Sequence, residues 1–221
     1  MLAKELISDI VPPVKTSNSG HEALNIMEDF RVNHLPIVNN RDFLGLISDE
    51  DIFSMDDQNE ALGSSALSLF SPYVFEHQHI YEVIELVSKL KLSLVPVLNE
   101  RKEYLGSIVI QDIIEKSALL TGAEQPGAIL VLNMTSRDYY LSEIARLVEE
   151  NDARIISLYV SSSTDSTEID VTLKLNLFDL TPIIRSFERF GYSIKASFRD
   201  EDKLDTLYRD RYEEFMRYLN I

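Results

Sequence analysis

The sequence predicts a mixed α/β (α+β) protein that consists of a tandem repeat followed by a smaller unit with a different pattern. A motif at 33–51 returns in altered form at 93–112. The stretch 121–127, which contains glycine and proline, then interrupts every apolar period. Beyond it, strand-like alternation and helical spacing follow in the order strand, helix, strand, strand, helix, strand. These three observations define the expected organisation.

The repeat is defined by residues that recur at a nearly constant spacing. Pro36 is followed sixty positions later by Pro96, and Asp51 is followed sixty-one positions later by Asp112. Each copy predicts a helix, a short buried strand, a turn, a second strand and a helix that begins near the aspartate. One copy alone is too small to bury a core well. We therefore expect the two copies to pack as one module.

The expected elements follow from capping and apolar spacing. Ser19 and Glu22 have the spacing of a capping box at the start of a helix that should run to about Asn33. Residues 35–38 and 43–47 are predicted to form the two paired strands of the first copy. The second copy predicts a helix over 80–90, strands over 94–98 and 104–109, and a closing helix over 111–119.

The doublet carrying His34-Leu-Pro-Ile-Val and Gly45-Leu-Ile-Ser-Asp-Glu-Asp resembles a pair of cystathionine-β-synthase (CBS) domains. The resemblance covers about residues 1–120, with repeats over about 1–58 and 61–120. It implies a tandem CBS-domain pair packed as one module, with a regulatory role and an adenosyl ligand such as AMP, ADP or ATP. It implies no required cofactor.

Ser48 and Asp51 stand where the second strand should pass into a helix, whose N–H groups can receive an anionic oxygen. The resemblance implies that Asp51 accepts the ribose hydroxyls and that Ser48 lies towards the first phosphate. It further implies that His34, Leu35 and Pro36 supply backbone groups and apolar surface for an adenine. The spacing of Ser48 and Asp51 is also a capping signature that needs no ligand, so both interpretations remain open.

The second copy keeps Asp112 but has Val109 where the first copy has Ser48. Valine can neither cap a helix nor bind a phosphate. Asp112 is therefore expected to form the weaker nucleotide site, or to be only a helix-start acid that the dipole stabilises by about 0.3–1 kcal/mol. If one nucleotide binds per chain, we expect it at the first motif.

Residues 128–200 should form a ferredoxin-like βαββαβ unit. It resembles an ACT-type domain, and the whole layout is similar to acetoin-utilisation accessory proteins. The resemblance implies dimerisation or an amino-acid ligand at the first strand-to-helix turn, near Ser136 and Asp138. That turn lacks the glycine common in amino-acid-binding relatives, and either side chain also reads as a helix N-cap. Residues 201–221 predict a C-terminal amphipathic helix.

The composition excludes several classes of protein. With 37 acidic and 21 basic residues the formal charge is −16, which disfavours nucleic-acid and membrane partners. The absence of cysteine and of any long apolar stretch predicts a cytoplasmic protein. His77 and His79 lack a third ligand at recognisable spacing, so we expect no metal site. The sequence has no catalytic nucleophile motif or P-loop, so we expect no enzyme.

Two functions remain open. The first is a non-catalytic sensor whose repeats bind an adenosyl ligand and whose last unit dimerises or senses a second ligand. The alternative is a structural or interaction protein with vestigial ligand sites, which Val109 and the missing glycine favour. A homodimer is expected because the βαββαβ unit exposes sheet edges and the tail helix needs cover.

Overall fold

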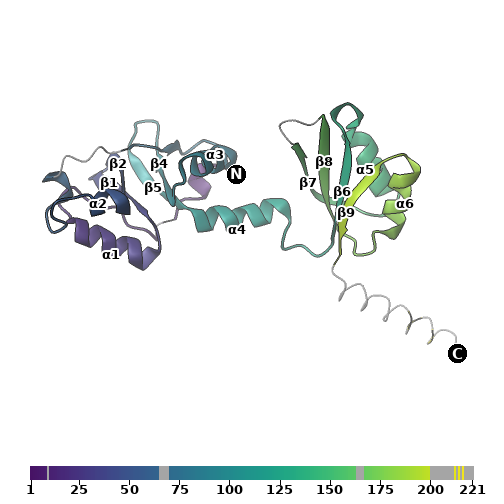
Figure 1. Ribbon diagram of the computed structural model, residues 1–221, viewed down its shortest axis with the longest axis horizontal. Helices are drawn as coiled ribbons and strands as arrows, with labels where there is room; N and C mark the ends of the chain where they lie inside the picture. Colours follow the sequence, from purple (N-terminus) through teal and green to yellow (C-terminus); the bar gives the residue numbers. More distant parts are fainter. Residues whose placement is uncertain are drawn as a thin grey trace. The chain divides into compact units, whose positions relative to one another are not determined.

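The computed structural model describes residues 1–8, 10–64, 70–162 and 167–199, together with Tyr212, Glu214 and Met216. The chain divides into two compact units, Met1–Lys116 and Ser117–Ile221. Figure 1 shows the elements of each unit.

In the first unit, each repeat contributes a helix, an antiparallel strand pair and a second helix (Figure 1). The first repeat contains the 3-10 turn η1 (Ala3–Glu5), with α1 (Gly20–Phe30), β1 (His34–Asn39), β2 (Asp42–Ser48) and α2 (Asp49–Phe53), and the 3-10 turn η2 (Leu62–Ser64) follows it. The second contains β3 (Val74–Phe75), α3 (Ile80–Leu90), β4 (Leu94–Leu98), β5 (Tyr104–Val109) and α4 (Ile110–Thr121). β3 lies parallel to β4, and the corresponding contact in the first repeat is the single bridge between Val14 and Ile37.

The first helix begins as predicted and ends early. Ser19 Oγ accepts the N–H of Glu22, and the Glu22 carboxylate accepts the N–H of Ser19, which completes the capping box. The helix ends before Arg31, whose φ of 54° is left-handed, rather than near Asn33. Lys91 ends α3 in the same way at φ 56°. A left-handed residue stops a helix because it turns the chain away from the helical path.

The segments that lead into the repeats cross between them. The N–H of Ser8 donates to the carbonyl of Ser107 at 2.9 Å, which places the first lead-in on β5. The N–H of Leu46 donates to the carbonyl of Phe70 at 2.8 Å, which places the end of the second lead-in on β2. A single apolar core contains buried residues from both repeats, as expected for two copies packed as one module.

The second unit has the predicted order of elements. These are β6 (Ala128–Thr135), the 3-10 turn η3 (Ser136–Asp138), α5 (Leu141–Glu149), β7 (Ile155–Ser162), β8 (Glu168–Leu175), α6 (Thr181–Arg189) and β9 (Ser193–Phe198). The strands form one antiparallel sheet in the order β7-β8-β6-β9. Both helices lie on the same side of that sheet (Figure 1). Leu130 and Leu132 of β6 are fully buried in the core of this unit.

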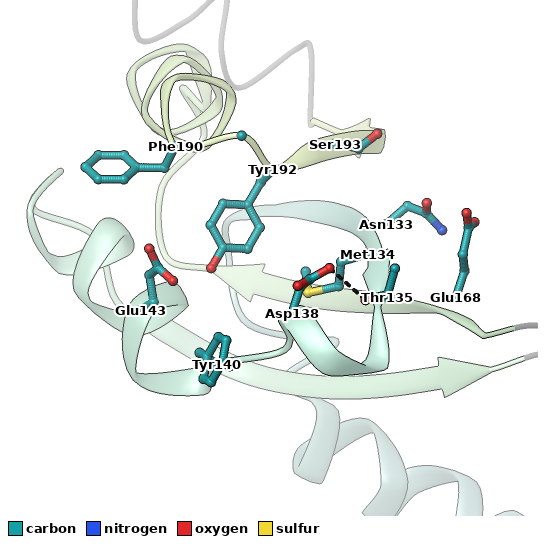
Figure 2. A pocket seen from close by; sticks show the side chains of 11 residues that line it. Asn133, Met134, Thr135, Asp138, Tyr140, Glu143, Glu168, Phe190, Tyr192 and Ser193 are labelled. Atoms are coloured by element: carbon teal, nitrogen blue, oxygen red, sulfur yellow. Dashed lines mark hydrogen bonds between the residues drawn. The ribbon is translucent and has the colours of Figure 1, made fainter.

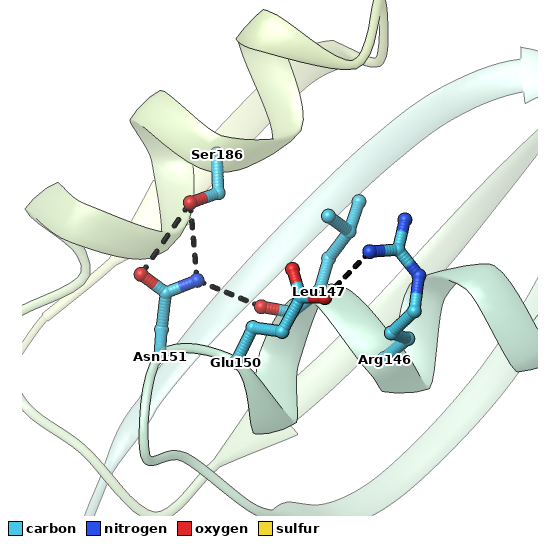
Figure 3. A network of polar contacts seen from close by, with 5 residues as sticks. All are labelled: Arg146, Leu147, Glu150, Asn151 and Ser186. Carbon is cyan, nitrogen blue, oxygen red and sulfur yellow. Dashed lines mark hydrogen bonds and ion pairs between the residues drawn. The ribbon is translucent and has the colours of Figure 1, made fainter.

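Polar contacts tie α5 to α6 in the second unit (Figure 3). Asn151, just beyond α5, donates through Nδ2 to the carbonyl of Leu147 at 2.7 Å and to Ser186 Oγ on α6 at 3.1 Å. Arg146 and Glu150 form an ion pair of 2.6 Å on the exposed side of α5. The asparagine therefore fixes the spacing of the two helices.

Two predictions concern the end of α4 and the C-terminal helix. α4 runs to Thr121, two residues beyond the predicted end at Leu119. The predicted C-terminal helix over 201–221 lies outside the described residues, apart from the exposed helical positions Tyr212, Glu214 and Met216. Within the described parts of the chain, no helix is both long and apolar enough to cross a membrane.

Candidate functional site

Ser48 and Asp51 bond to each other at the junction of β2 and α2. Ser48 Oγ donates to Asp51 Oδ2 at 2.6 Å, and the N–H of Ser48 donates to the same oxygen at 2.9 Å. In return, the N–H of Asp51 donates to Ser48 Oγ at 3.1 Å. The two side chains thus form a complete capping box on a helix of five residues. The capping role that the spacing allowed is present in the structure.

The three other residues expected at the first motif lie on β1. Leu35 and Pro36 are buried, Leu35 within the apolar core of the unit. His34 is half-buried and pairs in register with Ser48 on β2. Its ring therefore lies beside the capping box, whereas Leu35, on the opposite face of the strand, packs in the apolar core.

His34 joins the first repeat to the second through Ser93. Its Nδ1 lies 3.1 Å from Ser93 Oγ and 3.3 Å from the backbone nitrogen of Ser93, whose N–H donates to it. An imidazole nitrogen that accepts an N–H carries no proton. Burial lowers the pKa of His34, and the carboxylates of Asp49, Asp51 and Glu50 oppose this shift. The neutral ring is the form that fits these contacts.

A cavity of about 870 Å³ lies beside the second motif in the first unit. Ligand sites typically enclose about 300–1,000 Å³. Most of the lining is apolar or uncharged and comes from the first lead-in, the end of α1, Ser93 and the start of α4. It comprises Ile10, Val11, Phe30, Arg31, Val32, Asn33, Ser93, Val109, Ile110, Gln111, Asp112, Ile114 and Glu115. Both repeats therefore contribute to one cavity.

Asp112 provides the polar group with the clearest chemical role in this cavity. Its Oδ2 is buried and has no hydrogen-bond partner among the described residues. A buried carboxylate oxygen without a donor is costly, and a hydroxyl group would satisfy it. Among the described residues of the lining, the other charged ones are Glu115 and Arg31, so these residues carry more negative than positive charge.

Sequence reasoning missed the contribution of the first lead-in, Ile10 and Val11, to the site of the second repeat. The missing information was the crossing of the lead-ins, since a repeat alignment does not say which copy each segment packs against. The apparent histidine cluster has local roles. His77 stacks on Phe75 with centroids 5.7 Å apart, and His79 Nδ1 accepts the N–H of Tyr81 at the start of α3.

The described residues contain no group of three or more His, Cys, Asp or Glu side chains placed to hold a metal ion.

The second unit has its own cavity, of about 400 Å³, at the predicted strand-to-helix turn (Figure 2). Its lining comprises Asn133, Met134, Thr135, Asp138, Tyr140, Glu143, Glu168, Phe190, Gly191, Tyr192 and Ser193. Three of these residues carry carboxylates and three carry aromatic rings. None of the lining residues that the structure describes is a lysine or an arginine. Such a combination suits a ligand that carries an ammonium group.

The polar residues of this turn do not cap α5 as the sequence predicted. Ser136 Oγ donates to the carbonyl of Thr167 at 3.1 Å, and Asp138 accepts the hydroxyl of Thr135 at 2.7 Å (Figure 2). The residue before α5 is Tyr140, which makes no side-chain cap. Asp138 closes the 3-10 turn η3 instead, and this turn separates β6 from the helix.

The side chain of Tyr192 extends into the cavity with Glu143 on one side and Asp138 on the other (Figure 2). Burial raises its pKa to about 12, and a hydrogen bond to Glu143 acts in the same direction. The hydroxyl is therefore protonated at neutral pH and donates to the Glu143 carboxylate. Its ring packs edge-on against Phe187, with centroids 5.3 Å apart. Tyr192 thus holds one carboxylate in place at the cavity wall.

Comparisons with known proteins bear on the first unit. Residues 3–56 and 71–119 match the family model described as CBS domain. An inosine-5'-monophosphate dehydrogenase of Methanocaldococcus jannaschii is 24% identical over 131 residues, which make up 58% of this chain. The chain covers 26% of that enzyme, about a quarter of its length.

Several solved structures are similar to about half of the chain. A CBS domain pair/ACT domain protein of Thermotoga maritima aligns with a TM-score of 0.48 and 22% identity, over 53% of this chain and 96% of its own. CBSX2, solved in complex with AMP, aligns with a TM-score of 0.46 and 16% identity, over 52% and 95%. The CBS domain of a bacterial CNNM/CorC family Mg²⁺ transporter, in complex with ATP, gives 0.42 and 14%, over 52% and 86%.

The two segments that match the family model coincide with the two repeats of the first unit. The first unit is therefore a pair of CBS domains. This confirms the resemblance inferred from the repeated motif.

Proposed function

We propose that the protein is a non-catalytic sensor whose CBS pair binds an adenosyl ligand such as AMP, ADP or ATP. The observation that carries this proposal is the buried Oδ2 of Asp112, which has no hydrogen-bond partner among the described residues and lies at a cavity shared by both repeats. A ribose offers vicinal hydroxyls, and a carboxylate accepts such donors strongly. The resemblance to CBS domains independently implies the same class of ligand.

The cavity lining supports a specific arrangement of the ligand. Apolar side chains such as Val11, Val109 and Ile114 provide surface for a base. Arg31 is the basic residue of the lining, and it would face a phosphate. Asp112 and Glu115 place negative charge nearby, which disfavours a long polyphosphate because like charges repel. We therefore expect adenosine and AMP to bind more tightly than ATP.

The expectation that Ser48, Asp51, His34, Leu35 and Pro36 hold the ligand stays a prediction. The carboxylate of Asp51 already accepts two donors from Ser48. A ligand hydroxyl at Asp51 Oδ2 would have to compete with this capping box. We therefore assign the primary site to Asp112, which the sequence had ranked second.

A thermal-shift panel tests the proposal. It contains adenosine, AMP, ADP, ATP, S-adenosylmethionine and NAD, each with the wild-type chain and with Asp112→Ala. A ligand at a hundred times its dissociation constant adds about 2.7 kcal/mol to the free energy of unfolding. We expect a shift with adenosine or AMP that is absent in the variant. No shift with any member of the panel would favour the alternative, an interaction protein with vestigial sites.

We also propose that the second unit is an ACT-like domain that senses an amino acid. The cavity of about 400 Å³ lies at the turn where the resemblance implies such a ligand. Its carboxylates and rings would hold the ammonium group. Tyr192→Phe removes the hydroxyl that orients Glu143. It should weaken amino-acid binding and leave the melting temperature of the ligand-free chain nearly unchanged. A calorimetric panel of the common amino acids in which none binds would contradict this assignment.

A homodimer is the third part of the proposal. The edge strands β7 and β9 carry exposed apolar side chains, with Tyr159 54% and Phe198 59% exposed. Exposed edges with such side chains favour pairing with another chain. A second copy of the ACT-like unit would supply the partner strand.

A further inference from the structure

We propose that the C-terminal segment 203–221 folds back onto the sheet of its own chain and covers the face that α5 and α6 leave open. Two apolar surfaces of the second unit, one on the sheet and one on the segment, would then cover each other. This contact is independent of the ligands proposed above.

The sheet of the second unit has one covered face and one open face. α5 and α6 lie on the same side of it (Figure 1), and Leu130 of β6 is fully buried in the core on that side. Ile129 and Val131 alternate with Leu130, so their side chains point to the other face, where they are half-buried. The register places Phe198 of β9 beside Ile129, and Ala196 beside Val131. We call these four side chains of β6 and β9 the open strip.

Other contacts occupy the rest of this face. On β7, Ser157 Oγ donates to the carbonyl of Thr121 at 2.6 Å, so the end of α4 lies at that edge of the sheet. On β8, the Asp170 carboxylate accepts Asn133 Nδ2 at 3.1 Å and forms an ion pair with Lys195. The open strip therefore lies beside a polar network and away from the edge that α4 contacts.

A cavity of about 380 Å³ lies at the end of the open strip where β9 ends. Two residues of the strip, Ile129 and Phe198, contribute to its lining. The charged residues of the described lining are Lys174, Arg199 and Glu124. The next residues along the chain, 200–202, are all acidic. Since opposite charges attract, the start of the segment is drawn towards the two cations at this end of the strip.

The segment that follows β9 carries an apolar stripe of matching length. Tyr212 and Met216 are helical, lie four residues apart and are 63% and 37% exposed. A helix over 204–219 is about 24 Å long, and the eight residues of β6 span about 27 Å. Apolar residues recur along the segment at the spacing of one helix face, at Leu204, Leu207, Tyr208, Tyr212, Phe215 and Met216.

The short connection favours the sheet of the same chain over that of a second copy. Residues 199–203 separate Phe198 from Leu204. Connections of about 2–6 residues commonly join neighbouring elements. A short tether also gives an effective concentration in the millimolar range, far above the micromolar concentration of a second copy in solution.

Paired cysteines test this contact, because the natural chain contains no cysteine. Val131→Cys with Tyr212→Cys places one thiol on the open strip and one on the apolar stripe, and a short bis-maleimide should join them within one chain. The matched control pairs Tyr212→Cys with Ser142→Cys, since Ser142 is exposed on α5, on the other side of the sheet. We expect roughly tenfold more intramolecular product from the first pair at micromolar protein concentration.

A further substitution in the segment leaves the sheet unchanged. Leu207→Asp places a charge on the apolar stripe and should reduce the product of the Val131 and Tyr212 pair to that of the control pair. Product that survives this substitution would show that the stripe does not hold the segment on the sheet.

Hydrogen exchange of the full-length chain gives a measurement without cross-linking. Val131→Asp places a charge in the open strip and should speed the exchange of the amides over 204–219 roughly tenfold, because the segment is released. Ser142→Asp makes the same change on α5 and should leave that exchange as in the wild-type chain. Unchanged protection of β8 in both variants shows that the unit stays folded.

Several results would overturn the proposal. A covalent dimer as the main product of the Val131 and Tyr212 pair would assign the segment to the sheet of a second copy. Equal product from this pair and from the control pair would show chance encounters only. Exchange over 204–219 that Val131→Asp leaves unchanged would show that the open strip does not bind the segment.

Discussion

The backbone N–H of Asn33 donates to the hydroxyl of Ser93 at 3.0 Å, and these two residues occupy the same position in the two repeats, sixty residues apart. Both also line the cavity beside Asp112. The contact between equivalent positions therefore lies at the edge of the proposed ligand site. A ligand in this cavity would touch both repeats and would stabilise their association.

The pH dependence of stability should report on His34, which bonds to Ser93. Burial holds the pKa of His34 below its usual value, so the folded chain binds this proton less readily than the unfolded chain. The stability conferred by the neutral ring is fully present above the unfolded pKa, about 6.5. It is lost as the pH falls from that value through the lower folded pKa.

We therefore expect the melting temperature of the wild-type chain to fall more steeply below pH 6.5 than that of His34→Gln. The exposed His21 provides the matched control, and His21→Gln should follow the wild-type curve. Parallel curves for His34→Gln and the wild-type chain would refute this prediction.

The hydrogen bonds of Asn151 in Figure 3 should contribute more to the free energy of unfolding than the neighbouring ion pair does. Asn151→Ala removes three part-buried hydrogen bonds and should lower the free energy of unfolding by about 1–3 kcal/mol. Glu150→Ala removes only an exposed i,i+4 pair, which is worth about 0.3–0.5 kcal/mol. Urea denaturation of the two variants makes the comparison, and equal losses would contradict it.

Gly127 should be far less tolerant of alanine than Gly191. A Cβ at Gly127 would lie 1.9 Å from the carbonyl oxygen of Leu175, and its φ of 143° already favours glycine. Gly127→Ala should cost about 3 kcal/mol or more. Gly191 has φ 83° and no atom within 4 Å of the added Cβ, so Gly191→Ala should cost only the backbone strain, about 1–2 kcal/mol. Urea denaturation that ranks the two variants in the opposite order would show that the backbone at 127 can shift.

The dimer proposal predicts a specific mass in solution. Light scattering at micromolar concentration should give twice the chain mass of 25.3 kDa. Tyr159→Glu places a charge on the exposed edge strand and should give the monomer mass while leaving the melting temperature nearly unchanged. A monomer mass for the wild-type chain would eliminate the proposal.

The sequence predicted most of the elements because their signals are local. The strands over 94–98 and 104–109 were predicted with the observed bounds, since apolar runs and a turn delimit them. The early end of α1 was missed because Arg31 adopts a left-handed conformation, which an arginine in a sequence does not predict. The lead-ins cross between repeats through long-range pairing, which periodicity does not encode.

The ranking of the two motifs required knowledge of hydrogen bonds. From the sequence alone, Ser48 favoured nucleotide binding at the first motif, and Val109 disfavoured it at the second. In the structure, Ser48 donates twice to one carboxylate oxygen of Asp51, and Asp112 Oδ2 has no hydrogen-bond partner among the described residues. The opposite ranking, with Asp112 at the primary site, is our proposal from these contacts, and the ranking made from the sequence stays a prediction.

Calorimetric titration of adenosine into the wild-type chain, Asp112→Ala and Asp51→Ala tests the central proposal most directly. The proposal predicts one adenosine per wild-type chain, no measurable binding to Asp112→Ala, and nearly wild-type affinity in Asp51→Ala. Binding that survives Asp112→Ala and disappears in Asp51→Ala would contradict it and place the ligand at the first motif.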